Sequence, residues 1–124
     1  MTEVAEILSQ NPDYRNEAPI PSERELTEVE RQLGFRFPAE YREFVGLGGL
    51  NDLRFKNRVL GPSEIVESRG YVPQEQYVPF SSNGCGDLYC WDRSDGSVFF
   101  WDHESRTAYR HEENFLVWLR RNRF

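Results

Sequence analysis

Two cysteines and two histidines are the side chains best suited to holding a metal ion. They follow the pattern Cys85-x4-Cys90-x12-His103-x7-His111, and thiolates with imidazoles are the usual ligands of structural zinc. The interval between the histidines is longer than that of a zinc finger. Cys90 lies in an apolar run, where a free cysteine usually acts as a small hydrophobic residue. We therefore expect no metal and no cofactor, and a small zinc-binding protein stays a less favoured alternative.

His103 also lies between two carboxylates, in Asp102-His103-Glu104, which suggests general acid–base catalysis. Neighbouring residues of a strand point to opposite faces of its sheet, so this adjacency does not make a catalytic pair. Two Gly-x-Gly pairs, at residues 46–48 and 84–86, lack the further glycine or the lysine of a phosphate-binding loop. No motif supports an enzyme, and we expect a protein without catalytic activity.

Six carboxylates lie close in the sequence to aromatic residues of two apolar segments. The carboxylates are Glu75, Asp87, Asp92, Asp95, Asp102 and Glu104, and the aromatic residues are Tyr89, Trp91, Phe99 and Trp101. Acidic side chains at strand ends often form only a solvated rim. Alternatively, aromatic side chains anchor a protein partner while the negative field steers a basic one. On this second interpretation, Tyr89 and Trp91 are the anchors, and all six carboxylates belong to the partner-binding surface.

The net charge argues against a nucleic-acid-binding protein. The chain has 15 Lys and Arg against 21 Asp and Glu, a formal charge of −6, whereas nucleic-acid-binding domains carry a basic surface. Residues 1–50 hold ten acids and five bases, and residues 71–104 hold six acids and one base, Arg93. The aromatic middle of the chain is therefore one of its two acidic regions.

Length and composition predict a single folded domain over residues 1–124. A chain of 124 residues suits one domain and buries enough surface for a core without metal or disulfide staples. Nine Phe, three Trp and six Tyr argue against disorder. No apolar run is long enough to span a membrane, and the acidic start MTEVAEILSQ lacks the features of a signal peptide. We expect a cytoplasmic protein without membrane contact, monomeric or weakly dimeric.

The elements that position these residues begin with helices. Residues 4–8 carry apolar side chains at helical spacing and predict an opening helix. Ser22 followed by Glu25 predicts the capping box of a second helix, and Gly34 predicts its left-handed end. Pro38 at a first-turn position predicts a third, short helix.

Beyond residue 52 the apolar period changes to the alternation of strands. Asn83-Gly84 and Asp95-Gly96 predict tight turns, and the apolar segments around the second turn predict a hairpin in the middle of a sheet. Phe115, Trp118 and Leu119 have the spacing of a closing helix. Helices, then strands, then a helix indicate an α+β fold. The expected strands are residues 53–55, 58–60, 77–80, 88–92 and 97–102.

Four segments in this order resemble the SUKH superfamily, also called the Smi/Knr-type domain. The first is ELTEVERQLGFRFPAEYREF at residues 25–44, an acidic helix ending in Leu-Gly, then Pro and a Tyr-x-x-Phe helix. Gly48-Gly49 follows as the family's Gly-Gly, without the usual preceding Asn. The second and third are NGCGDLY at 83–89 and GSVFFWDH at 96–103, and the fourth is the closing helix. The resemblance covers about residues 22–121 and leaves an extra helix before it.

The resemblance implies an α+β fold with a central, mostly antiparallel sheet of about five or six strands, packed by N-terminal helices and a C-terminal helix. It also implies a function, because bacterial SUKH proteins are mostly immunity proteins that bind a cognate toxin domain, often a nuclease or deaminase of a polymorphic or contact-dependent toxin. The favoured hypothesis is an immunity protein that occludes the active site of such a toxin, whose own domain we expect to be basic. The alternative is a regulatory or adaptor module without a toxin partner.

Overall fold

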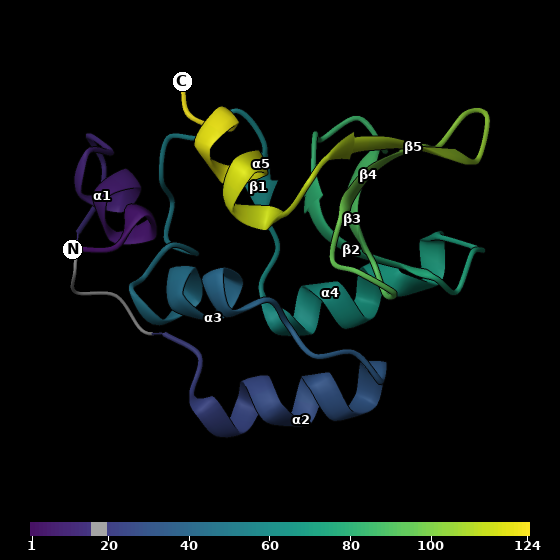
Figure 1. The fold of residues 1–124 in the computed structure, drawn as a ribbon, viewed down its shortest axis with the longest axis horizontal. Coiled ribbons are helices and arrows are strands. Elements are labelled where there is room, and N and C mark those ends of the chain that lie inside the picture. Colours follow the sequence, from purple (N-terminus) through teal and green to yellow (C-terminus); the bar gives the residue numbers. More distant parts are fainter. Residues whose placement is uncertain (16–19) are drawn as a thin grey trace.

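The computed structural model describes residues 1–15 and 20–124, and there the chain combines helices with one antiparallel sheet (Figure 1). The helices are α1 (Glu3–Ser9), α2 (Glu23–Leu33), α3 (Ala39–Gly46), α4 (Pro62–Ser68) and α5 (Phe115–Arg121), with a 3₁₀ turn η1 (Arg69–Tyr71). The strands are β1 (Arg58–Val59), β2 (Tyr77–Ser82), β3 (Leu88–Asp92), β4 (Val98–Asp102) and β5 (Thr107–Glu112). The predicted α+β class is confirmed. None of the helices in the described residues is long and apolar enough to cross a membrane.

Local signals in the sequence place α2. The Ser22 hydroxyl accepts the backbone N–H of Glu25 at 3.1 Å, which satisfies a donor that the first turn would leave open. Gly34 ends the helix at φ +64°, where a side chain would be strained. The reciprocal bond of a capping box, from Ser22 N–H to the Glu25 side chain, is not among the hydrogen bonds of the described residues. Pro38 is the N-cap of α3 rather than a residue of its first turn.

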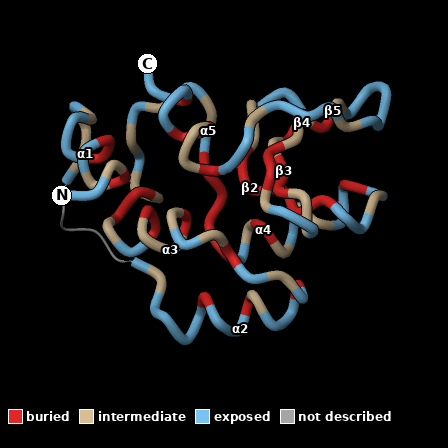
Figure 2. The backbone as a smooth tube through the Cα atoms, viewed as in Figure 1, coloured by how far each residue is buried: buried red, intermediate tan, exposed pale blue. Residues whose placement is uncertain are grey.

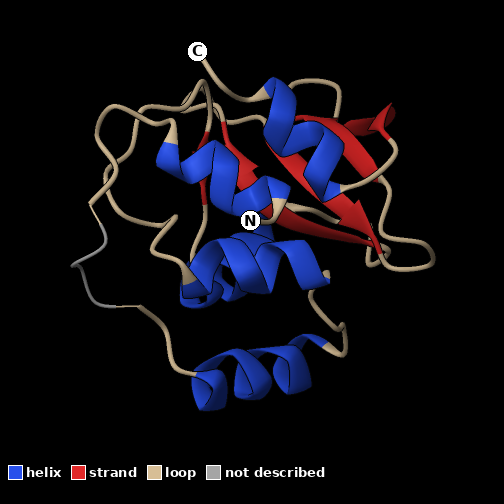
Figure 3. Ribbon diagram, turned by 60° about the vertical axis from the view of Figure 1, so that its left-hand side comes forward, coloured by secondary structure: helices blue, strands red, loops and turns tan. Residues whose placement is uncertain are grey.

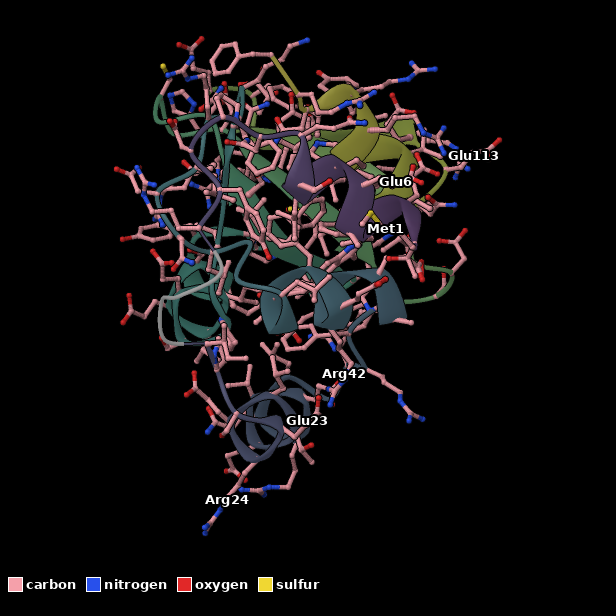
Figure 4. All side chains as sticks on the ribbon, turned by 90° about the vertical axis from the view of Figure 1, so that its left-hand side faces the viewer. Met1, Glu6, Glu23, Arg24, Arg42 and Glu113 are labelled. Carbon is pink, nitrogen blue, oxygen red and sulfur yellow. The ribbon has the colours of Figure 1, made fainter. Side chains whose placement is uncertain are left out.

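Glu30 holds α2 against α3. One carboxylate oxygen accepts the Phe37 backbone N–H at 2.7 Å, and the other lies 2.8 Å from the Arg42 guanidinium. Arg42 also pairs with Glu23 at the start of α2, and the two side chains approach each other from neighbouring helices (Figure 4). The Glu30 and Arg42 side chains are mostly buried, so solvent screens this pair only partly.

The sheet is a meander in the order β1-β2-β3-β4-β5, with every neighbouring pair antiparallel. The predicted hairpin forms with β3 and β4, in a register that pairs Leu88 with Trp101 and Trp91 with Val98. Gly96 in its turn has φ +76°, as the Asp-Gly signal predicted. β3 is the central strand, which agrees with its apolar residues on both faces.

The two faces of the sheet are covered differently. The main core lies on one face, which we call the helix face, where buried residues of the helices pack with Val78, Phe80, Trp91 and Val98 (Figure 3). α4 contributes Ile65 to this core and its other side borders the opposite face. The opposite face, which we call the second face, holds a smaller cluster that includes Leu88, Cys90 and Trp101. Val72, just after η1, packs onto that cluster. The second face therefore has a much thinner cover than the helix face.

Trp91 lies at the centre of the main core. Its ring stacks on Phe80 at 4.5 Å between centroids and meets the edge of Tyr41 at 5.0 Å. Phe35 and Phe37, in the connection between α2 and α3, approach the same indole at 5.6 and 5.8 Å. The buried residues follow this arrangement, since they lie along β2 and β3 and on the sides of the helices that face the core (Figure 2). An aromatic cluster of this size supplies a large share of the apolar burial that stabilises the fold.

The predicted strand at residues 53–55 is wrong. Only Phe55 makes a strand-like pairing, with Arg123 beyond α5. Lys56 N–H donates to the Asn122 carbonyl at 2.8 Å, and Asn57 N–H donates to the Asn122 side chain at 2.9 Å. These backbone groups are thus satisfied by the end of α5 and not by a neighbouring strand.

Two elements were not predicted, α4 and β5. Pro62 opens α4, and Glu64 accepts the Gly61 N–H at 3.0 Å, so the start of this helix is capped from within its first turn. β5 pairs only with β4 and carries mostly exposed, polar residues, as suits an edge strand. Its weak apolar alternation explains why the sequence pattern did not reveal it.

Candidate functional site

The six predicted contact carboxylates occupy two separate ends of the β3–β4 hairpin. One group, which we call the turn end, consists of Glu75, Asp92 and Asp95, and the other, which we call the base end, consists of Asp87, Asp102 and Glu104. Because the strands are antiparallel, five-residue strands separate the two ends by about 14 Å along the sheet. The loop carrying Glu75 joins the turn end, since Arg93 Nε donates to the Glu75 carbonyl at 2.6 Å.

Trp91 is not available as a surface anchor. It is fully buried under residues from the α2–α3 connection, α3 and α5, so the predicted anchoring role is corrected. Tyr89 lies on the same face and is half-buried, with its ring 5.3 Å from Phe100 and 5.5 Å from Trp118. Phe99 and Trp101 point to the second face. The four aromatic residues therefore do not form one surface.

At the turn end, the carboxylates shape the backbone. Asp92 accepts the Ser94 N–H at 2.9 Å and its hydroxyl at 2.8 Å, and Asp95 accepts the Ser97 N–H at 2.9 Å and its hydroxyl at 2.6 Å. These bonds are Asx turns, in which a short acidic side chain replaces a backbone acceptor. The Ser97 hydroxyl and N–H hold the pKa of Asp95 below its usual range. Asp95 thus remains charged while it holds the turn.

At the base end, Asp87 and His103 form a hydrogen-bonded pair. One Asp87 oxygen accepts the His103 backbone N–H at 3.0 Å and lies 2.6 Å from the ring Nδ1, while the other accepts the Asn83 side chain at 3.0 Å. These donors lower the pKa of Asp87, and the carboxylate bonded to its ring raises the pKa of His103. Gly86 lies against the same ring, since a Cβ placed there would come within 3.0 Å of it.

The four predicted candidates for zinc do not converge. Cys90 is buried on the second face, whereas His111 contacts Tyr89 on the helix face. Cys85 is an exposed, free thiol in the β2–β3 loop, and burial raises the pKa of the Cys90 thiol. Within the described residues, the one group with metal-like proximity is Asp87, Asp102 and His103. Hydrogen bonds among themselves and to the hairpin backbone already account for this group.

Two surface hollows were not predicted from the sequence. The first, a basic groove of about 760 Å³, lies among α1, the loop before β1 and the end of α5. Its basic lining residues are Arg54, Lys56, Arg120, Arg121 and Arg123. The excess of bases in residues 51–70 and 105–124 is the one sequence signal that pointed to it. The second, of about 600 Å³, lies on the second face between α4 and the sheet.

This architecture coincides with a family match over most of the chain. Residues 20–121 match the SMI1 / KNR4 family (SUKH-1). The chain belongs to this family. A crystal structure of a protein from Pseudomonas syringae pv. tomato has the same fold as this SUKH-1 chain, with a TM-score of 0.58 and 22% sequence identity over 94% of this chain and 95% of that one. No curated protein sequence matches the chain.

The residues shared with the SUKH-1 pattern build the fold. Gly34 ends α2 in the left-handed region, and a Cβ on Gly49 would lie 2.5 Å from the ring of Phe44. Tyr41 donates its hydroxyl to the Leu60 carbonyl at 2.8 Å inside the core. These positions explain why the family pattern is recognisable in sequence, and they leave the surface free to vary.

Proposed function

We propose that this SUKH-1 protein is an immunity protein that binds a cognate bacterial toxin domain and neutralises it by occluding the active site. The family match over residues 20–121 carries the proposal, because bacterial proteins of the superfamily that the sequence resembles are mostly immunity proteins. The two acidic ends of the hairpin support a basic partner, since a nuclease or deaminase that binds nucleic acid presents positive charge around its substrate site.

Binding, rather than catalysis, is the activity that the side chains favour. The Cys90 thiol is buried and held protonated, and a protonated thiol is a poor nucleophile. The His103 ring is engaged by Asp87 through Nδ1. Neutralisation by steric and electrostatic occlusion needs neither group to react.

We assign the first contact to the turn end of the hairpin. Asp95 and Glu75 are exposed and Asp92 is half-buried, and the Glu75 carboxylate is paired with the Arg69 guanidinium at 2.9 Å, which leaves Asp95 and Asp92 as the main source of negative charge there. Charges at the rim of an interface mainly accelerate association, while buried anchors determine how long the complex lasts. In place of Trp91, three large aromatic side chains of the described residues are exposed and available for anchoring: Tyr71, Tyr109 and Phe124.

Co-expression with the toxin encoded beside its gene tests this function. The expected result is restored growth of cells that make the toxin and recovery of a stable complex of the two proteins. Growth arrest in spite of abundant folded protein would overturn the proposal. If no toxin gene is adjacent and the protein instead co-purifies with a regulatory enzyme, the adaptor function replaces it.

A further inference from the structure

The basic groove gathers positive charge from three segments that lie far apart in the sequence. Its volume of about 760 Å³ is within the range of ligand-binding pockets, and Figure 1 shows α1, the loop before β1 and the end of α5 on the same side of the molecule. Bases at the end of α5 complement the helix dipole, but Arg54 and Lys56 come from another segment. No acidic side chain of the described residues lines the groove, although the chain as a whole has a net charge of −6.

Backbone contacts fix the walls of the groove relative to one another. The Asn11 side chain, just after α1, donates to the Arg54 carbonyl at 2.9 Å and accepts the Arg54 N–H at 3.3 Å. The next residues join the end of α5, since Phe55 pairs with Arg123 in a strand-like bridge, and the Lys56 N–H donates at 2.8 Å to the carbonyl of the residue that caps α5. The groove is therefore formed before any partner binds, which lowers the entropic cost of binding.

Two of the five bases have no carboxylate partner among the described residues. The other three each pair with a carboxylate that does not line the groove, in the pairs Arg54–Asp13, Arg120–Glu3 and Arg121–Glu112. Arg123 donates from Nε to the Arg120 carbonyl at 3.0 Å and from Nη1 to the Gln10 side chain at 3.3 Å. Two uncharged oxygens thus hold this guanidinium in place without matching its charge. The Lys56 ammonium makes no ion pair within the part of the chain that the structure describes.

Much of the groove lies outside the part of the chain that matches the SUKH-1 family. The match covers residues 20–121. The lining residues before and after it are Ile7, Gln10, Asn11, Pro12, Arg123 and Phe124. Arg123, the cation held by two uncharged acceptors, is therefore not part of the common family pattern. This placement favours recognition of a partner that is specific to this protein.

Carboxylates and phosphates both suit arginine and lysine side chains, and the surroundings of the groove favour carboxylates of a protein. A nucleic acid gains its affinity from many phosphate contacts along an extended basic surface. Here the groove offers two cations without carboxylate partners, and the molecule around it has a net negative charge. Phe124 lines the groove and is 80% exposed, so apolar contact is available beside the cations. A short acidic protein segment fits these features better than a nucleic acid does.

We propose that the basic groove binds an acidic segment of a protein partner, whose carboxylates pair with Arg123 and Lys56. Hydrogen bonds between a guanidinium and a carboxylate are charge-assisted and stronger than neutral ones. The partner then has two kinds of surface, because its basic groups face the turn end of the hairpin and its acidic segment faces the groove. That this partner is the toxin rests on the proposed function, whereas recognition of an acidic segment does not.

NMR titration at low salt tests this recognition without any toxin. The probes are the peptide acetyl-Glu-Glu-Phe-Glu-Glu-amide, its neutral counterpart acetyl-Gln-Gln-Phe-Gln-Gln-amide, and pentathymidylate, a DNA strand with the same negative charge as the acidic peptide. The acidic peptide is expected to shift the backbone amide signals of residues 53–57 and 120–124 saturably. The neutral peptide should leave them in place, and pentathymidylate should bind several-fold more weakly.

Three results of this titration would overturn the proposal. The first is the absence of a saturable shift with the acidic peptide, and the second is an equal shift with the neutral one. The third is binding of pentathymidylate as tight as that of the acidic peptide or tighter, which would assign the groove to nucleic acid.

Charge-removing variants test the two cations. Lys56→Gln and Arg123→Gln should each raise the dissociation constant for the acidic peptide about threefold to fivefold, as expected for one exposed ion pair. The double variant should raise it about tenfold or more, since separate contacts add. Lys56→Gln keeps the test valid if Arg123→Gln disturbs the end of the chain, because the Lys56 backbone N–H, and not its side chain, holds the loop.

The matched control is Arg24→Gln with Arg36→Gln, which removes two exposed bases elsewhere. Arg24 points away from the body of the molecule at the far side of α2 (Figure 4). This control should change the dissociation constant by less than about twofold, the residual effect of net charge. Unchanged affinity in the folded Lys56→Gln, Arg123→Gln protein, or an equal loss in the control, contradicts the assignment.

The two proposals fail separately. Saturable binding of the acidic peptide to a protein that does not neutralise the toxin supports the role of the groove and refutes the immunity function. Full neutralisation by a protein whose groove does not bind the acidic peptide supports the immunity function and refutes the role of the groove.

Discussion

At the scale of single residues, the glycine pair after α3 illustrates how one atom limits the sequence. Gly49 approaches the Phe44 ring so closely that a Cβ would lie 2.5 to 2.6 Å from three ring carbons. Phe44 is fully buried, so the ring cannot swing aside without disturbing the core. A Cβ added to Gly46, three residues earlier, would have no heavy atom within 4 Å.

Gly49→Ala should therefore lower the free energy of unfolding by about 1–3 kcal/mol, the usual cost of overpacking a core. Urea denaturation gives the value. The matched control is Gly46→Ala, which should leave stability unchanged or raise it by up to about 1 kcal/mol, because alanine replaces glycine within a helix. Equal stability of the two variants would contradict the packing found here.

The Asp87–His103 pair predicts a pH dependence. Asp87 has a lowered pKa, so its contribution to stability is present above the unfolded carboxyl pKa and is lost as pH falls through the folded value. His103 has a raised pKa, so its contribution is complete below the unfolded imidazole pKa and is lost as pH rises through the folded value. The pair therefore stabilises the fold most between about pH 4 and pH 6.5.

NMR titration of the histidine ring measures this directly. The midpoint for His103 should lie above that of an unperturbed imidazole and should fall towards it in Asp87→Asn. His111→Gln removes the only other histidine and assigns the signal. An identical His103 midpoint with and without the Asp87 carboxylate would rule out the pair in solution.

At the scale of elements, Glu30 joins three segments with one side chain. It binds the Phe37 N–H and the Arg42 guanidinium while it belongs to α2. Two residues earlier on the same helix, Glu28 pairs with Arg31 across an exposed surface. The two glutamates differ in burial and in partners but share their helix, so they form a natural comparison.

Glu30→Ala should lower the free energy of unfolding by about 1–3 kcal/mol, because it leaves a partly buried N–H and a guanidinium without their acceptor. Glu28→Ala should change it by less than about 0.5 kcal/mol, since exposed pairs contribute little. Thermal and urea unfolding of both variants provide the comparison. A larger loss in Glu28→Ala would show that the α2–α3 contact is misassigned.

The elements that were predicted correctly have their start, end or turn marked by residues that lie next to them in the sequence. Ser22 and Gly34 mark the two ends of α2, and Asp95-Gly96 marks the central hairpin. The predictions of secondary structure fail where contacts with distant segments determine the conformation. Within residues 53–55, Arg54 bonds to the Asn11 side chain and Phe55 pairs with Arg123 beyond α5 instead of forming a strand. The polar edge strand β5 is held by its pairing with β4.

At the scale of the whole molecule, the same distinction governs the candidate site. The carboxylates can be predicted because they are charged and lie near turns. Five of the six lie at the ends of β3 and β4, and Glu75 lies in the loop before β2. The sequence does not reveal that Trp91 is buried, because the rings that cover it belong to residues 35, 41 and 115, far away in the sequence. The basic groove and the hollow between α4 and the sheet are each lined by three or more segments that lie far apart in the sequence, so the sequence pattern did not reveal them.

The distribution of acidic charge predicts the kinetics of partner binding. Replacing Asp92 and Asp95 with asparagine keeps an oxygen acceptor for Ser94 and Ser97 and removes two charges. The association rate constant should fall several-fold at low salt and converge with that of the unmodified protein at high salt. The dissociation rate constant should change little. Surface plasmon resonance against the toxin domain measures both.

The control for that measurement lies on α2, where Glu25→Gln with Glu28→Gln removes two exposed charges elsewhere. A similar drop in association rate for this control would mean that net charge, and not the turn end, steers the partner. An unchanged rate in the Asp92→Asn, Asp95→Asn protein would remove the turn end from the interface.

The most direct measurement is the catalytic activity of the purified toxin domain during titration with this protein. The immunity function predicts that activity falls to the background level at one equivalent. Full toxin activity in the presence of an excess of folded protein would contradict it.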